Sequence, residues 1–333
     1  MNDIQVTSCR EQGHRDNLED ALGALSIGHL LSPKSDIAIA IVADGVGGNN
    51  YGEIASNEVV NTIEHLMASS LAAQTPDRSI TPHTLRNLLR QHLIATNDLI
   101  LSLVDNDPTL KGMSTTVVCA VIADGTLHVG WAGDSRCYLY RRKRLKLLTK
   151  DHTEAQLLVD KGLLDTQYAQ FHPLSHMINQ YIGKANDFEP ETATATLYPG
   201  DIILLTTDGL TDALTDKEIA SLVRKYQEGN FSFKRLPSYL VESALAAGST
   251  DNITVLCCEY APKQVPIHNL FESTLTGTYP AEFPKVLRNL NKETQDVRSK
   301  RKNTTRKSTA SKGACSARQS TMFSLFGCNE HRR

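Results

Sequence analysis

The sequence lacks the features of a secreted, disulfide-stapled or membrane-spanning protein. Its seven cysteines are an odd, scattered set without a C-x-x-C pair, which argues against a disulfide framework and a zinc knuckle. The first residues contain no apolar segment of a signal peptide, and the longest apolar runs, such as residues 37–43, are far too short to cross a bilayer. These absences predict a protein of a reducing compartment, with the cytoplasm as its location.

The chain of 333 residues also lacks an internal repeat, a G-x-G-x-x-G motif and a strong net charge, the formal sum being −2. That sum hides two unlike regions. Residues 285–333 carry 13 Lys or Arg against 3 Asp or Glu, whereas residues 1–284 carry 22 against 34. The sequence therefore describes an acidic body, long enough for one large domain or two, followed by a basic tail.

Short β-branched apolar runs separated by turn residues predict antiparallel sheets. Strands are expected at residues 36–44, 114–123, 127–132, 137–141, 145–148, 192–197, 202–206 and 252–259, with a hairpin turn at Asp124-Gly125. Apolar residues three and four apart predict helices at residues 52–73, 84–104, 154–161, 216–227 and 236–247. Because the strands are joined by short hairpins and the helices are grouped between them, the predicted fold class is α+β.

The basic tail changes character from about residue 291, where Lys and Arg mix with Ser and Thr and apolar periodicity ends. Such a segment is expected to be disordered. It is either a solvated extension or a segment that contacts an anionic partner or a membrane surface by charge. No specific nucleic acid binding is expected, because residues 298–318 contain no aromatic side chain on which bases could stack.

Acidic residues recur at the expected strand ends and turns. Each alone is explained by turn chemistry, since Asp caps its own backbone and the following Gly adopts positive φ. Asp44 and Asp208, however, both follow an apolar strand and both precede Gly. If these strand ends converge, the carboxylates repel one another unless cations lie between them, and oxygen-rich sites suit Mg²⁺ or Mn²⁺.

Seven short motifs carry a resemblance to a known family. They are RDNLED at 15–20, DGVGG at 44–48, GMSTT at 112–116, GDSR at 133–136, LTKDHT at 148–153, TDGLTD at 207–212 and DNIT at 251–254. In this order they resemble the motifs of the PPM, or type 2C, metal-dependent serine/threonine protein phosphatases. The resemblance does not extend into the tail.

The resemblance implies a central β-sandwich of two antiparallel sheets flanked by helices on both faces. It implies a catalytic domain at residues 1–262, with a flap subdomain at about 153–187, and leaves residues 263–333 as a C-terminal extension. The flap is either a surface excursion or a lid that contributes to phosphoprotein choice. The implied protein is a cytoplasmic monomer of bacterial type that dephosphorylates phosphoserine and phosphothreonine proteins and opposes a Ser/Thr kinase.

The resemblance also implies a metal centre. Asp44 would bridge two Mn²⁺ or Mg²⁺ ions, and the Gly45 carbonyl would complete one of them. The remaining implied ligands are Asp208 and Asp251 for the first ion, Glu19 for the second with Asp20 ordering its water shell, and Asp134 and Asp212 for a third, weaker ion. A hydroxide between the two main ions would attack phosphorus in line, so no cysteine need act.

Arg15 would grip the substrate phosphate, because its planar guanidinium pairs with two oxygens at once. The general acid stays open, because Val46 occupies the position where many eukaryotic relatives carry His. His152, His172 and His176 are candidates by residue type, and water is another.

Two alternatives differ in kind from an active enzyme: a catalytically inactive phosphoprotein-binding module on the same fold, and an adaptor whose function lies in the tail. The presence of four implied ligands, Glu19, Asp44, Asp208 and Asp251, favours the active enzyme.

Overall fold

The computed structural model describes residues 4–27, 37–46, 51–73 and 81–261. The chain divides into two compact units, residues 1–263 and 264–333, and every described residue lies in the first. The disorder expected from about residue 291 therefore concerns a segment outside the described residues.

The described residues contain ten strands in two five-stranded sheets. One sheet has the order β1-β10-β9-β6-β7, the other has the order β2-β3-β4-β5-β8, and all neighbouring strands are antiparallel. The strands are β1 Ile4–Glu11, β2 Asp20–Ile27, β3 Ile37–Asp44, β4 Val117–Ala123, β5 Thr126–Ala132, β6 Arg136–Arg141, β7 Arg144–Leu147, β8 Glu191–Thr196, β9 Asp201–Thr206 and β10 Ile253–Tyr260.

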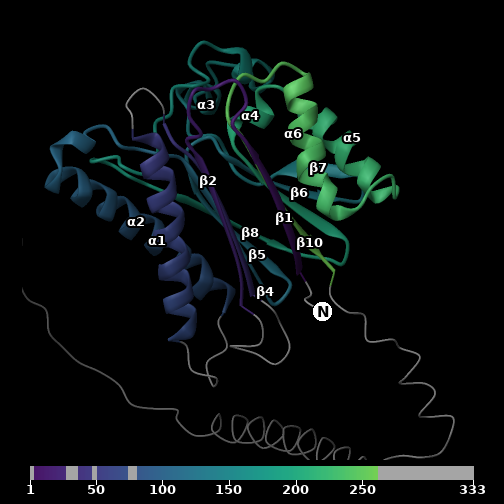
Figure 1. Ribbon diagram of the computed structural model, residues 1–333, viewed down its shortest axis with the longest axis horizontal. Coiled ribbons are helices and arrows are strands. Elements are labelled where there is room, and N and C mark those ends of the chain that lie inside the picture. The colour runs from purple at the N-terminus through teal and green to yellow at the C-terminus, as the bar shows by residue number, and fades with distance from the viewer. Residues whose placement is uncertain (1–3, 28–36, 47–50, 74–80, 262–333) are drawn as a thin grey trace, which may run out of the picture. The chain divides into compact units, whose positions relative to one another are not determined.

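Helices cover the outer face of each sheet. The helices of the described residues are α1 Gly52–Ala72, α2 Pro82–Asn106, α3 Glu154–Asp160, α4 Asp208–Thr211, α5 Asp216–Gln227 and α6 Leu236–Ala246, with short 3₁₀ helices η1 Pro108–Leu110, η2 Thr166–Phe171 and η3 Phe233–Arg235. Helices α1 and α2 pack on the sheet that contains β3, whereas α5 and α6 pack on the sheet that contains β10 (Figure 1). The described part of the chain is thus a helix–sheet–sheet–helix sandwich.

The central strands are buried on both faces, which explains their continuous apolar sequences. In β3, the odd-numbered residues 37–43 pack against α1 and α2, whereas the even-numbered residues 38–42 face the other sheet. Strand β4 alternates in the same way. Antiparallel strands usually alternate apolar and polar residues, but strands in the middle of this four-layer arrangement have no solvent-facing side.

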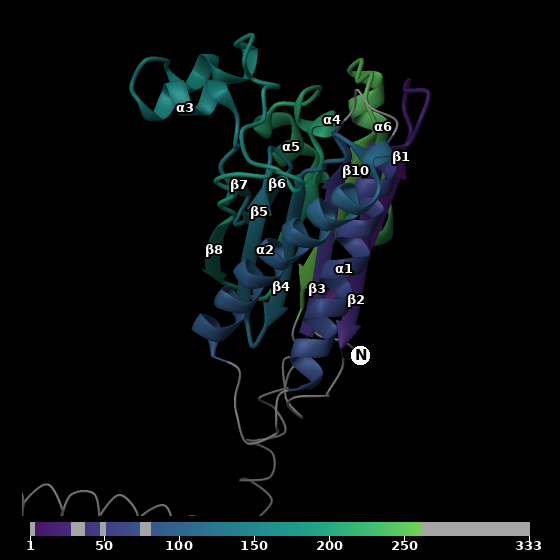
Figure 2. The ribbon, with the colours of Figure 1, turned by 90° about the vertical axis from the view of Figure 1, so that its left-hand side faces the viewer.

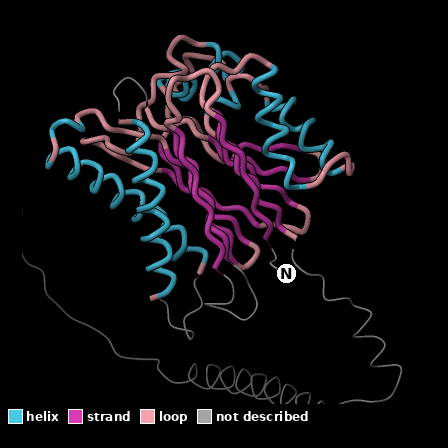
Figure 3. Tube along the Cα trace, viewed as in Figure 1, coloured by secondary structure: helices cyan, strands magenta, loops and turns pink. Residues whose placement is uncertain are grey.

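The connections at one end of the sandwich carry the motifs. Asp20 begins β2, Asp44 ends β3, and residues 207–212 follow β9. Figure 3 shows loops gathered at this end of the strands, and Figure 2 shows α3 with its neighbouring loops standing beyond it. The sandwich therefore serves to bring distant acidic segments together.

The structure confirms the α+β class and the two antiparallel sheets. The turn at Asp124-Gly125 has positive φ at both residues, 48° and 69°, as a tight hairpin requires. Strands β1 and β2 were not predicted; each is one of the two edge strands of its sheet, and their sequences carry no long apolar run. In the described residues, no helix combines the length and apolar character needed to cross a membrane.

Candidate metal centre

A cavity of about 760 Å³ opens at the end of the sandwich where the motifs meet. It is lined by eight of the nine residues that the sequence predicts for the site, namely Arg15, Glu19, Asp44, Gly45, Asp134, Asp208, Asp212 and Asp251. The ninth, Asp20, is buried and pairs in register with Asp44 across strands β2 and β3. The fold thus brings together every predicted site residue.

Burial beside like charges raises the pKa values of the central carboxyl groups. Removal from water is the main cause in each case, and neighbouring carboxylates add to it. The pKa of Asp20 rises to about 7 and that of Asp208 to about 6, while the pKa values of Asp44 and Asp134 lie well above the usual range. Such a cluster is costly to keep ionised without a cation.

Two oxygens of the cluster have no protein partner. Oδ1 of Asp20 and Oδ1 of Asp208 are both buried, and neither accepts a hydrogen bond from the described residues. The other oxygen of Asp20 accepts a hydrogen bond of 3.0 Å from the Thr207 hydroxyl. Buried oxygens that accept nothing from the protein, in a site made of carboxylates, fit hard divalent cations.

The backbone of Asp44 is fixed by the GMSTT motif. The Thr115 hydroxyl and the Thr116 backbone N–H both donate to the Asp44 carbonyl, at 2.7 and 2.8 Å. The Asp44 N–H in turn donates to Thr116 Oγ1 at 3.1 Å. The sequence identified this motif through its family resemblance but indicated no role for it. In the structure, its two threonines position Asp44.

The glycines after Asp44 and Asp208 allow close backbone approach. A Cβ on Gly45 would lie 2.4 Å from the Gly52 backbone, and one on Gly209 would lie 2.0 Å from the Asn252 carbonyl. Neither glycine has positive φ, so these Asp-Gly pairs do not form the positive-φ turn that was one explanation of their sequence. They let segments distant in sequence touch at the cavity.

Asn252 organises the N-terminal wall of the cavity. Its side-chain oxygen accepts the Glu19 N–H at 2.7 Å, and its amide nitrogen donates to the carbonyls of Gln12 and Asn17. Arg15, on the same loop, forms an ion pair of 2.5 Å with Asp251. Sequence reasoning included Asn252 in a motif but assigned it no role, and nothing in its local sequence indicates these contacts.

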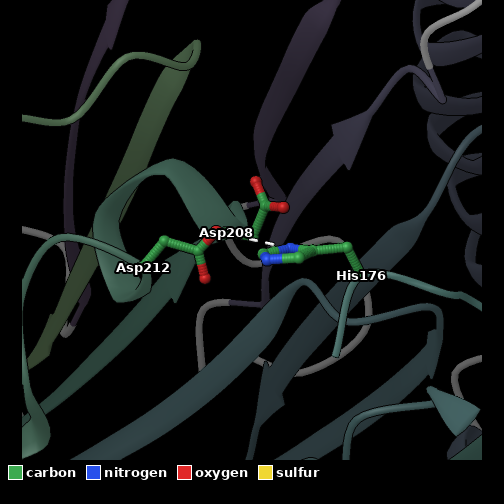
Figure 4. Close-up of side chains that lie close together, drawn as sticks. All are labelled: His176, Asp208 and Asp212. Carbon is green, nitrogen blue, oxygen red and sulfur yellow. Dashed lines mark ion pairs between the residues drawn. The ribbon is translucent and has the colours of Figure 1, made fainter. Parts of the chain in front are cut away.

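Of the three histidines considered as acids, only His176 lines the cavity. His152 is buried, stacks on Trp131 and lies 3.4 Å from a Glu191 oxygen. His172 accepts the Leu174 N–H through Nδ1. Figure 4 shows the His176 ring facing the carboxylates of Asp208 and Asp212, with Nδ1 3.6 Å from Asp212 Oδ2.

Comparison with known families decides the assignment. Residues 16–242 match the family model described as protein phosphatase 2C. The chain belongs to this family. Among its relatives, serine/threonine phosphatase stp of Listeria welshimeri is 28% identical over 70% of this chain and 88% of that protein. Protein phosphatase PhpP of Streptococcus pneumoniae is 33% identical over 65% of this chain and 82% of that protein.

Solved structures of the phosphatase 2C family have the same fold. The serine/threonine phosphatase of S. agalactiae is 28% identical, with a TM-score of 0.67 over 77% of this chain and 99% of that one. The catalytic domain of the phosphatase PstP, solved with two manganese ions, is 28% identical with a TM-score of 0.60 over 78% and 98%. By its family and its fold, the chain is a bacterial-type protein serine/threonine phosphatase, as the motifs predicted.

Proposed function

We propose that this protein hydrolyses phosphoserine and phosphothreonine in proteins with the help of two divalent cations held at the cavity. The observation that carries the proposal is the convergence of Asp20, Asp44 and Asp208, with raised pKa values and two unpartnered buried oxygens, at a cavity open to substrate. The two manganese ions of the PstP structure support the choice of Mn²⁺ or Mg²⁺.

The proposed ligands follow the arrangement of the cavity. Asp44 would contact both ions, with its neighbour Gly45 offering a backbone carbonyl; Asp208 and Asp251 would serve one ion, Glu19 the other, and Asp20 would accept hydrogen bonds from the water around them. Asp134 and Asp212 would hold a third, weaker ion. When bound, such cations lower the pKa of water and screen the charge on the phosphoryl group.

Arg15 is proposed to bind the phosphate. Its guanidinium stands at the cavity wall, is 54% exposed and is paired with Asp251. One guanidinium N–H donates to Asp251 Oδ2, and the fork of N–H donors that Arg15 carries matches two oxygens of a phosphate. Arg15 would therefore exchange one anion for another as substrate arrives.

The proton for the leaving alkoxide needs a source other than Val46. Val46 lines the cavity, and its backbone N–H donates to the Ser114 carbonyl, but its side chain carries no transferable proton. His176 and water are the candidates that the cavity offers.

The alternative to an active enzyme is a catalytically inactive phosphoprotein-binding module on the same fold. It would have no reason to keep Glu19, Asp44, Asp208 and Asp251 around one cavity, because like charges there oppose folding unless they serve a bound cation. We propose phosphoproteins as substrates, opposed by a Ser/Thr kinase, and a cytoplasmic location.

The proposal is tested by hydrolysis of a phosphothreonine peptide with Mn²⁺ and with chelator. The peptide is expected to be hydrolysed when Mn²⁺ is present without chelator. Chelator is expected to abolish hydrolysis, and excess Mn²⁺ is expected to restore it. Activity that survives chelation would exclude the proposed chemistry. Removing residues 285–333 tests the adaptor alternative: hydrolysis of a small aryl phosphate is expected to persist, and its loss would place the tail in the catalytic unit.

A further inference from the structure

Asn97 is a polar side chain on the buried face of helix α2. It lies one helical turn from Leu93 on one side and from Ile100 on the other, and both belong to the apolar core beneath the helix. Asn97 itself is only 3% exposed. A buried amide costs stability unless its groups are hydrogen-bonded, so the partners of Asn97 indicate its role.

The side chain of Asn97 binds one short segment of the excursion of residues 153–187. Its Oδ1 accepts the Gly183 N–H at 2.8 Å and the Lys184 N–H at 3.1 Å. Its Nδ2 donates to the Lys184 carbonyl at 3.1 Å. Asn97 thereby attaches α2 to the returning end of the excursion, residues 182–184.

The returning end is also bonded to the residue that holds Asp44. Ile182 and Thr115 exchange two backbone hydrogen bonds, of 2.9 and 3.1 Å. The Thr115 hydroxyl donates to the Asp44 carbonyl at 2.7 Å. Thr115 therefore contacts the excursion through its backbone and Asp44 through its side chain.

The packing between the returning end and the GMSTT motif is close. Gly183 has a φ of 102°, and a Cβ at this position would lie 2.6 Å from the Met113 carbonyl. Because close-packed groups transmit strain, a displacement of residues 182–184 is expected to move Thr115 as well.

We propose that Asn97 is a positioning residue of the metal centre, which fixes residues 182–184 and, through Thr115, the backbone of Asp44. The inference rests on the proposed function, because that function gives Asp44 its place between two cations. Groups that orient metal ligands from behind change affinity or activity about 10- to 100-fold when they are removed. Asn97 would thus influence turnover from the far side of α2's interface with the excursion.

The test compares Asn97→Ala with Thr96→Ala in the full chain. Thr96 is the matched control, since it is buried on the same helix but its hydroxyl donates to the His92 carbonyl within that helix. Hydrogen exchange in chelator reports on the backbone of residues 113–117 and 182–184, with strand β9 as the reference. Turnover of a phosphothreonine peptide in saturating Mn²⁺ reports on the site, at a temperature where urea unfolding shows each variant to be folded.

We expect faster exchange in both segments of metal-free Asn97→Ala, with β9 unchanged, because the loss is local. Thr96→Ala is expected to leave both segments like the wild type relative to β9. In Mn²⁺, kcat of Asn97→Ala is expected to fall about tenfold or more with KM within about twofold, whereas Thr96→Ala keeps both values.

A double-mutant cycle shows whether Asn97 acts through Thr115. Thr115→Val removes the hydroxyl that holds Asp44 and keeps the size of the side chain. The kcat of the double variant is expected to lie within about threefold of that of Thr115→Val alone, because both substitutions interrupt one chain of contacts. If Asn97→Ala does not fold, Asn97→Asp takes its place; it keeps the accepting oxygen and loses the donor, so a smaller loss of kcat is expected, again non-additive.

Three results would overturn the proposal. They are a wild-type kcat in the folded Asn97 variant, losses of kcat that multiply in the double variant, and exchange that quickens at residues 182–184 but not at 113–117. If the wild type shows no Mn²⁺-dependent turnover, the proposed function fails. The exchange data, taken without metal, still decide whether Asn97 holds Thr115, so the two failures are distinguishable.

Discussion

Asp20 and Asp44 lie directly opposite each other at the last pair of the β2–β3 ladder. Like charges in this position oppose strand pairing, and burial makes the opposition stronger. Burial is the main cause of the raised pKa values of both groups; the charge of Asp20 adds to it at Asp44, and the charges of Asp208 and Asp251 add to it at Asp20. A protein that keeps such a pair at the inner end of a cavity carries an electrostatic cost that a bound cation removes.

The metal-free protein is expected to lose stability from this pair as pH rises. The folded-state pKa of Asp20, about 7, exceeds the unfolded value of about 3.9, so the native state holds the proton more strongly. Its stabilising effect is complete below about pH 4 and is lost as pH rises through about 7, at about 1.4 kcal/mol per pKa unit.

Comparison with Asp20→Asn isolates this effect, because the buried histidines His128 and His152, whose pKa values are lowered, titrate in both proteins. In chelator, Asp20→Asn is expected to be more stable than the wild type at pH 8 and similar at pH 4.5, by urea unfolding. Excess Mn²⁺ is expected to reverse the order at pH 8. A difference that does not depend on pH would contradict the account.

Arg15→Ala is expected to raise KM for a phosphothreonine peptide about tenfold or more, because a bidentate contact to the phosphate is lost. Mn²⁺ binding is expected to stay or tighten, since Asp251 loses a competing cation. Arg15→Lys is expected to recover part of the affinity, because a point charge remains. Steady-state kinetics and Mn²⁺ dialysis check this; an unchanged KM in Arg15→Ala would remove Arg15 from the phosphate site.

Asn252→Ala is expected to weaken both fold and activity. Three hydrogen bonds to the loop of residues 12–19 disappear, which costs about 1–3 kcal/mol in unfolding free energy. Activity is expected to fall further than stability accounts for, because Glu19 and Arg15 lose their support. Asn57→Ala, which removes one exposed bond to the Glu53 carbonyl, is the control. Equal effects of the two substitutions on activity would show that Asn252 does not support Glu19 and Arg15 at the site.

The sequence predicted the architecture wherever burial leaves a periodic signature. Strands such as β3 and β9 were predicted because both of their faces are apolar. Strands β1 and β2 were missed because their mixed sequences resemble loops, whereas the equally mixed edge strands β7 and β8 were predicted from the turn residues beside them. The amphipathic helix α5 begins at the capping box of Thr215 and Glu218, a signal that lies within its own sequence.

The site was predicted through its motifs, and its supporting contacts were not. Residues such as Asp44 and Asp208 stand next to glycine in short recognisable segments. Asn252 and His176 act through partners that are distant in sequence, and no local pattern marks such contacts. The role of Gly209 was not predicted for the same reason. The absence of a side chain at Gly209 leaves room for the backbone carbonyl of Asn252, which is distant in sequence.

The central claim is that the clustered aspartates hold the cations that drive phosphate-ester hydrolysis. The most direct measurement compares phosphothreonine-peptide turnover in saturating Mn²⁺ for the wild type, Asp44→Asn and the exposed control Asp98→Asn on α2. Loss of at least about a thousandfold in Asp44→Asn, with fewer Mn²⁺ bound and Asp98→Asn unchanged, is the predicted result. Turnover within about tenfold of the wild type in Asp44→Asn would contradict the account.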